Sequence, residues 1–335
     1  MRNGATDDPR VVRYAPPFGL SLLFQSLPKK GLREKLEVTY APTKGQSRFR
    51  YSGACALGIP DQTLLLALLE VGQARMNQHP EATILSGETM APIGQELWNM
   101  LNGGQSNEAR ATVFFQTSWF ELATRCGLSS GGSVLKTLRA QLMRLCETIV
   151  WEYEGKSETP VSQSFLVAWL KADERQLHLA VNFRLASALF GDRYSPVSMT
   201  ERLALHSDIA RASHAFLSTT IGPGKSLGIG VDKLARRLWP KRSDETPPGT
   251  RRRQNMDIRD ALAEIGCLPA WMVSINPNDV ARVLRASGGV RDMTVARPIT
   301  NKSSSERERT PMPNAATGAG FGAVDVSGLF STENS

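Results

Sequence analysis

Cysteine and histidine are scarce in this chain of 335 residues, with four of each, and none stands in a metal-ligating motif such as C-x-x-C or H-E-x-x-H. The sequence therefore predicts neither a metal centre nor a bound cofactor. The longest apolar run, residues 64–69, is far shorter than the roughly 20 residues of a membrane-spanning helix. Because the N-terminus lacks the apolar core of a secretory signal, we expect a cytoplasmic protein with reduced cysteines.

Catalytic motifs are also missing. Residues 222–226 contain the G-K-S of a phosphate-binding loop, but Thr219 stands where that loop needs its leading glycine. The segment also follows a predicted helix rather than a strand, so we interpret it as a tight turn. No serine–histidine–aspartate set and no pair of catalytic carboxylates stands out. We expect a protein that is not an enzyme, with ATP binding through the G-K-S turn as a distant alternative.

The chain carries 40 Lys and Arg against 32 Asp and Glu, a net charge of +8. From about residue 286 the sequence is rich in Ser, Gly, Thr, Pro and Ala without a sustained apolar period, which is typical of a disordered tail. The charges of this tail cancel. The excess of positive charge is concentrated in residues 233–259, which contain nine Lys and Arg and three Asp and Glu. A localised basic patch indicates a polyanionic partner, most commonly nucleic acid.

The front of the chain has the pattern of mixed α and β structure. Residues 36–40 and 49–51 alternate apolar and polar around a turn at 42–45, which predicts a β-hairpin. A helix with a buried leucine stripe is expected after Pro60. Residues 72–110 are rich in Gly, Asn, Gln and Pro, and we interpret them as an insertion that holds a helix near its end.

A helix-turn-helix pattern begins at Thr117, which can cap a short helix that Gly127 ends. Ser129 and Ser130 can cap a second helix over residues 131–146. That helix has one apolar face. Its other face carries the small polar and cationic side chains that a recognition helix presents to a major groove.

Three strands predicted at residues 149–153, 164–170 and 177–181 follow this helix. The turn at Gly155 and Lys156 is then the tip of the wing in a winged-helix module. A helix followed by strands also occurs in plain protein cores, so this segment alone favours DNA binding no more than a structural role.

Residues 206–285 repeat the same plan. The pattern predicts helix, strand, helix, helix and two strands at residues 206–221, 227–231, 232–239, 247–266, 271–275 and 280–284, with a helix as the alternative for the last segment. The long helix has an apolar stripe at Ile258, Ala261, Leu262 and Ile265. Its opposite face is rich in arginine, whose paired donors match guanine O6 and N7, and a helix N-terminus favours phosphate. This helix is therefore the stronger candidate for reading DNA.

The candidate DNA-contacting residues lie on the two recognition helices, at the first wing tip or in the basic patch. In the first module they are Ser129, Ser130, Ser133, Lys136, Thr137, Arg139, Arg144 and Lys156. In the second module they are Arg236, Arg237, Lys241, Arg242, Thr250, Arg251, Arg252, Arg253, Met256 and Arg259. We interpret residues 251–253 as base or phosphate contacts rather than as a solvated surface.

Three segments carry a resemblance to a known family. They are KLEVTYAPTKGQSRFRYSGACALGIPDQTLLLALL, VSMTERLALHSDIARASHAFLSTTIGPGKSLGIGVDKLARRLWP and TRRRQNMDIRDALAEIG. With a weaker match between them, they make residues 18 to about 285 similar to the RepC-type replication initiators of IncQ-like plasmids. Ala54 and Cys55 replace the family's usual proline, and the tail has no family counterpart.

The resemblance implies two winged-helix domains that bind directly repeated origin sequences (iterons). It also implies a plasmid-encoded helicase and primase as partners, and a homodimer that limits copy number. None of these partners is visible in composition or spacing.

We therefore expect an α+β protein with two tandem winged-helix domains. The expected parts are a flexible N-terminus (1–17), a first domain (18–184) with an insertion near 72–110, a second domain (185–285) and a disordered tail (286–335). The expected function is plasmid replication initiation, by binding double-stranded direct repeats at the origin, opening the origin and loading a helicase. Two alternatives stay open: a winged-helix repressor of its own operon, and a protein-interaction scaffold that does not bind DNA.

Overall fold

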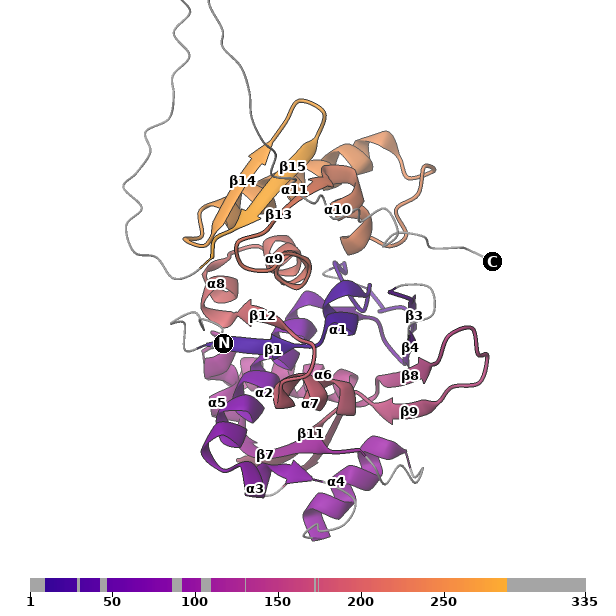
Figure 1. Ribbon diagram of the computed structural model, residues 1–335, viewed down its shortest axis with the longest axis vertical. Helices are drawn as coiled ribbons and strands as arrows, with labels where there is room; N and C mark the ends of the chain where they lie inside the picture. Colours follow the sequence, from indigo (N-terminus) through magenta and orange to yellow (C-terminus); the bar gives the residue numbers. More distant parts are fainter. Residues whose placement is uncertain are drawn as a thin grey trace, which may run out of the picture. The chain divides into compact units, whose positions relative to one another are not determined.

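The computed structural model of the chain describes residues 10–28, 31–42, 47–85, 92–103, 110–129, 131–171, 173 and 175–287. These residues form a mixed α+β structure that runs from strand β1 (Val11–Tyr14) to strand β15 (Val280–Arg285) (Figure 1). Within those ranges, no helix has both the length and the apolar character needed to span a bilayer. The predicted disordered tail lies, from residue 288 onward, outside the residues that the structure describes.

Helix α2 (Ile59–Gln78) is the central element of the core. Leucines and an alanine fill residues 64–69, all fully buried, so this stretch is apolar on every side, as expected of a helix enclosed by protein. Strand β7 (Thr112–Ser118) and helices α6 (Gly132–Cys146) and α9 (Asp208–Thr220) pack around it. The helix predicted after Pro60 is thus confirmed.

Two antiparallel sheets lie in the first half of the chain. One has the order β3 (Leu36–Tyr40), β4 (Arg48–Gly53), β8 (Ile149–Tyr153) and β9 (Ser162–Phe165). The other has the order β10 (Val167–Lys171), β11 (Gln176–Val181), β7 and β6 (Ile84–Leu85). The predicted hairpin is confirmed, with Val38 opposite Tyr51. The single strand predicted at 164–170 is wrong, because Leu166 separates two strands that belong to different sheets.

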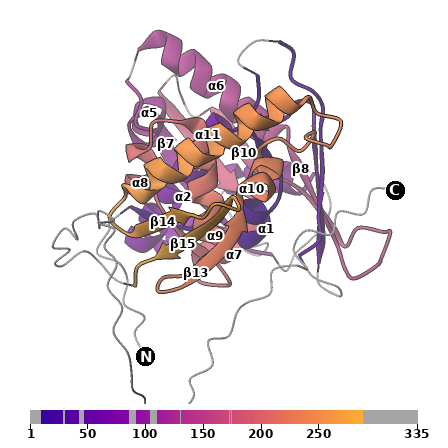
Figure 2. The same cartoon turned by 90° about the horizontal axis from the view of Figure 1, so that it is seen from above.

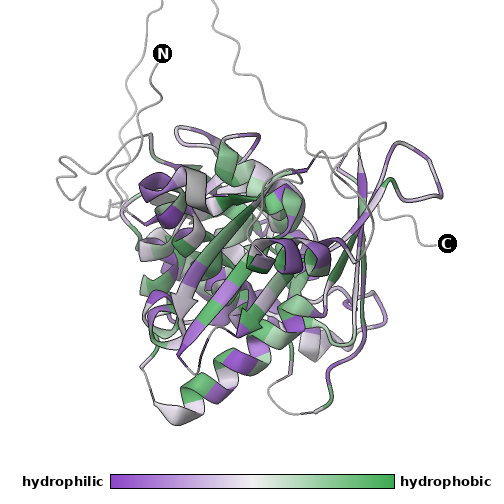
Figure 3. Cartoon of the chain, turned by 90° about the horizontal axis from the view of Figure 1, so that it is seen from below, coloured by the Kyte–Doolittle hydropathy of each residue, from purple (hydrophilic) through white to green (hydrophobic). Residues whose placement is uncertain are grey.

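Shorter elements complete this half. They are α1 (Pro16–Leu20), the parallel pair β2 (Phe24–Gln25) and β5 (Leu57–Gly58), α3 (Pro80–Thr83), α4 (Pro92–Asn102), α5 (Trp119–Arg125) and α7 (Phe183–Phe190). Helix α4 confirms the helix expected in the insertion, and it buries Leu97, Trp98 and Leu101 in a small separate core. Helices at the surface carry both hydrophilic and hydrophobic residues (Figure 3).

The prediction of a flexible N-terminus up to residue 17 is wrong for residues 10–17. Strand β1 pairs antiparallel with β12 (Ser195–Ser198), and Val12 lies opposite Val197. Val12 and Tyr14 are fully buried, so this strand fills part of the core instead of projecting into solvent. Residues 1–9 lie outside the described residues.

From α9 onward the second half follows the predicted order of elements. It begins with α8 (Met199–Ala204), which the sequence did not predict, and continues with α9, β13 (Ser226–Gly230), α10 (Val231–Leu238), α11 (Pro248–Gly266), β14 (Trp271–Ile275) and β15. The three strands form an antiparallel sheet in the order β13, β15, β14, so residues 280–285 are a strand and not a helix. Helix α11 lies across α9 and α10, as Figure 2 shows.

The two predicted domains share one core. Their expected boundary, between residues 184 and 185, falls inside helix α7 rather than in a linker. A single cluster of buried apolar side chains runs from Val12 to Val283 and includes both halves. The positions of α6 and α11 are therefore fixed by one packed interior.

Candidate nucleic-acid interface

Helix α6 presents the polar face that the sequence predicts. Leu138, Leu142 and Leu145 are buried against the core. The opposite side exposes Ser133, Lys136, Thr137 and Arg139, and Ser129 is exposed in the preceding turn. The expected serine cap is wrong, because the helix begins after Gly131 without a side-chain cap; Ser130 lies outside the described residues.

Arg144 belongs to a buried ion-pair network, which corrects its assignment to the DNA-contacting face. Its Nη2 donates to Oδ1 of Asp61 at 2.6 Å, and the Asp61 side chain is fully buried. Asp61 also accepts from Arg33 at 2.7 Å and from the backbone N–H of Gly58 at 2.7 Å. A buried carboxylate needs such donors. Arg144 therefore joins α6 to the start of α2.

A turn joins β8 and β9 at the position where the sequence predicts a wing tip. Lys156 is exposed in this turn, next to Gly155, whose φ of +56° is readily adopted by glycine. An exposed lysine at the end of a hairpin can reach a phosphate.

Helix α11 confirms the predicted stripe and the predicted exposed face. Ile258, Ala261, Leu262 and Ile265 are its buried residues. Arg252 and Arg253 are exposed near its N-terminus and make no ion pair with any described residue. Thr250 and Met256 are exposed on the same part of the helix.

Much of the basic patch is neutralised by nearby acids. Arg236 Nε donates to Asp232 at 2.9 Å. Asp244 lies 3.3 Å from Arg236 and 3.9 Å from Arg251. The local charge excess therefore overstates the cations that are free to meet DNA.

Two further cations of the set are paired with acids outside this cluster. Lys241 Nζ pairs with Glu34 at 2.5 Å. Arg259 Nη2 pairs with Asp279 at 2.6 Å, in the turn between β14 and β15. Asp279 has a φ of +57°. Arg259 therefore holds this turn against α11, and its assignment as a free DNA contact is corrected.

Arg237 and Arg242 point into the protein, so their assignment to the DNA surface is wrong. Arg237 donates to the carbonyls of Leu20 and Ser21 and lies 4.2 Å from the ring centre of Phe216. Burial lowers the pKa of Arg237 to about 10. The Arg242 side chain is 2% exposed. Both arginines are held by residues of other segments, and the spacing of residues in the sequence gives no sign of these contacts.

Arg282 is a further exposed cation, which is not among the predicted DNA-contacting residues. It lies on the outer face of the C-terminal sheet. Alternation along β15 buries Ala281 and Val283 and exposes Arg282. This face holds a shallow hollow of about 350 Å³, lined by Ser226, Gly228, Ser274, Asn276, Val280 and Arg282. The alternation of apolar and polar residues over 280–285 is the sequence signal that could have identified Arg282 as exposed.

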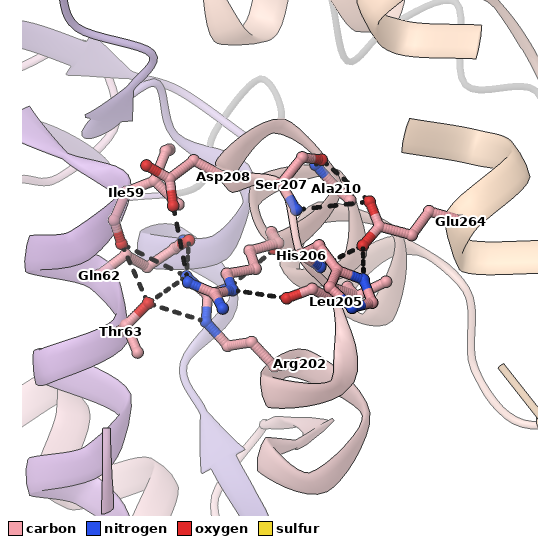
Figure 4. A network of polar contacts seen from close by, with 11 residues as sticks. Ile59, Gln62, Thr63, Arg202, Leu205, His206, Ser207, Asp208, Ala210 and Glu264 are labelled. Atoms are coloured by element: carbon pink, nitrogen blue, oxygen red, sulfur yellow. Dashed lines mark hydrogen bonds and ion pairs between the residues drawn. The ribbon is translucent and has the colours of Figure 1, made fainter. Parts of the chain in front are cut away.

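A buried arginine connects the two halves of the core (Figure 4). Arg202 of α8 is fully buried and donates to Thr63 Oγ1 at 3.0 Å, to Gln62 Oε1 at 3.1 Å and to the carbonyl of Arg211 at 2.7 Å. Burial lowers the pKa of Arg202 to about 10. These contacts tie α2 to α8 and α9.

Helix α11 is attached to the same region through Glu264. Its carboxylate accepts from the Ser207 hydroxyl at 3.0 Å and from the backbone N–H of His206 (Figure 4). Ser207 is the residue at which α9 is capped. The helix that carries the free arginines is therefore tied to α9, which packs against α2.

An α+β fold with two helices that expose cations without an ion-pair partner among the described residues makes this chain a candidate nucleic-acid-binding protein. Residues 8–285 match the family model of replication protein C (RepC). The chain belongs to the RepC family of replication initiators, which confirms the resemblance drawn from its sequence.

Two solved structures of RctB are similar to this chain. A selenomethionine derivative of RctB domains 2 and 3 gives a TM-score of 0.49 at 10% identity, covering 80% of this chain and 97% of that one. A second structure of RctB domains 2–3 gives 0.46 at 10% identity, covering 81% and 97%. The comparison with curated proteins finds no match.

Proposed function

We propose that this chain initiates plasmid replication by binding directly repeated double-stranded DNA at the origin. The observation that carries the proposal is the exposed pair Arg252 and Arg253 at the start of α11, without a carboxylate partner among the described residues, in a member of the RepC family. A cationic helix N-terminus can meet both phosphates and base edges.

The two halves are proposed to be winged-helix modules. In the second half the order α9, β13, α10, α11, β14, β15 matches a helix-turn-helix followed by a β-hairpin wing. In the first half α5, α6 and the hairpin of β8 and β9 take the corresponding places. Helices α6 and α11 are then the two recognition helices.

Phosphate contacts would position the protein and arginine would read bases. Lys136, Arg139 and Lys156 are exposed in the first half and suit phosphate anchoring. Arg252 and Arg253 suit guanine, because each offers two parallel donors to O6 and N7. Binding strains the adjacent duplex, and an A·T-rich segment opens for helicase loading.

The shared core supports one chain per repeat. Because α6 and α11 are held by a single packed interior, their spacing is set before DNA arrives. Two such helices suit successive major grooves, roughly 10 base pairs apart.

We propose that the protein works by binding and not by catalysis. A plasmid-encoded helicase and primase, and a homodimer that limits copy number, are its proposed partners.

The proposal is tested by selecting duplexes from a random-sequence library with the full chain. We expect enrichment of one sequence that spans at least one helical turn and is bound far more tightly than a scrambled duplex. Weak binding that is indifferent to sequence would favour the scaffold alternative and contradict the proposal.

A further inference from the structure

Arg242 lies in the loop between α10 and α11, and both terminal nitrogens of its buried guanidinium donate to residues of these two helices, while its Nε has no partner among the described residues. It pairs with the Asp232 carboxylate of α10. It also donates to Gln254 Oε1 at 3.1 Å and to Asn255 Oδ1 at 2.8 Å on α11. A guanidinium is buried without large cost only when such acceptors meet it.

These contacts lie on the N-terminal part of α11, before its first buried apolar residue. The buried apolar residues of the helix begin at Ile258, and its N-cap, Pro247, offers no side-chain hydrogen bond. Residues 248–257 therefore depend on polar contacts for their placement. Arg242 supplies these from the loop, including a 3.5 Å contact with the carbonyl of Arg251.

The acceptors and the free arginines lie on different parts of the helix surface. Gln254 and Asn255 turn their side chains toward Arg242. Arg252 and Arg253 precede them and are exposed to solvent. The Arg242 contacts thus hold the first turns of the helix, from which these arginines project.

We propose that Arg242 is a positioning residue for DNA recognition, which acts through Arg252 and Arg253 without touching DNA. The inference rests on the proposed function, because it concerns how the same helix reads DNA. The planar fork of arginine meets acceptors on two helices at once, in a fixed geometry that the single ammonium of lysine does not reproduce.

A double-mutant cycle tests this role. The four full-length proteins are wild type, Arg242→Gln, Arg252→Ala/Arg253→Ala and the triple variant. The probe is the duplex that the wild-type chain enriches from a random library, with a scrambled duplex as the reference. We expect Arg242→Gln to weaken binding to the enriched duplex about tenfold, and less than twofold when Arg252 and Arg253 are already absent.

Additive losses would overturn the proposal, because they would mean that Arg242 contacts DNA itself or acts through the rest of the fold. An unchanged affinity in Arg242→Gln would overturn it as well. If Arg242→Gln does not fold, Gln254→Ala/Asn255→Ala carries the test, because it keeps the pair between Arg242 and Asp232 and removes the acceptors on α11. A wild-type chain that enriches no duplex would refute the proposed function instead.

Discussion

Replacing Arg252 and Arg253 together by alanine removes the two exposed arginines of α11 that make no ion pair with a described residue. Neither side chain holds part of the core, so we expect the same thermal midpoint as the wild type. A bidentate contact between arginine and guanine is worth about 1–3 kcal/mol. Loss of two such contacts then weakens specific binding by about 2–6 kcal/mol, roughly 30-fold to 20,000-fold.

The assay is a fluorescence anisotropy titration with the duplex enriched by the wild-type chain, repeated with a scrambled duplex. The matched control is Arg175→Ala/Arg193→Ala, which removes the same charge from two exposed positions off both proposed recognition helices. We expect the control to lower both affinities slightly and equally, through the lost charge alone. If the α11 variant behaves like the control, this helix does not read bases.

Three other expectations follow from the polar contacts. Asp244→Asn removes the acid paired with Arg251 and one of the two acids paired with Arg236, so we expect tighter binding to any DNA and a steeper dependence on salt. The melting midpoint should not change, because Asp244 is exposed. Unaltered binding to a scrambled duplex would count against this expectation. Arg144→Met leaves buried Asp61 with fewer hydrogen-bond donors, so we expect the free energy of unfolding, measured in urea, to fall by about 2–3 kcal/mol. The salt dependence of DNA binding should stay the same, because Arg144 does not face DNA. Burial lowers the pKa of His214, and its hydrogen bond to Glu201 opposes this shift. The stability of the wild type is therefore full above the free histidine pKa of about 6.5 and declines as the pH falls below it, and His214→Gln should reduce this decline in the urea unfolding midpoint. A wild-type midpoint that stays constant as the pH falls below about 6.5 would contradict the burial argument.

The sequence identified the elements whose signal is local. The 3.6-residue period of α11 fixes its buried stripe at Ile258, Ala261, Leu262 and Ile265, and the structure buries those four residues. The short strands β13 and β14 were found from their apolar composition and the turns around them. Each of these signals lies within about 20 residues of chain.

Contacts between distant segments could not be predicted in the same way. Strand β1 has four residues, and its partner β12 lies in the second half of the chain, so nothing near residue 11 indicates the pairing. Arginines at 237 and 242 carry the same sequence signal as those at 252 and 253. Arg237 is buried against the carbonyls of Leu20 and Ser21, and Arg242 against acceptors on α11. Charge counts therefore identified the basic patch but not its free members.

Footprinting of the purified chain on the DNA that flanks its own gene, with excess competitor DNA and a salt titration, tests whether the chain recognises direct repeats. We expect protection of tandem direct repeats, with the logarithm of affinity falling by about 0.9 per neutralised phosphate for each log unit of salt. A single protected site at the promoter would support the repressor instead. No protection above competitor would contradict DNA recognition by this chain.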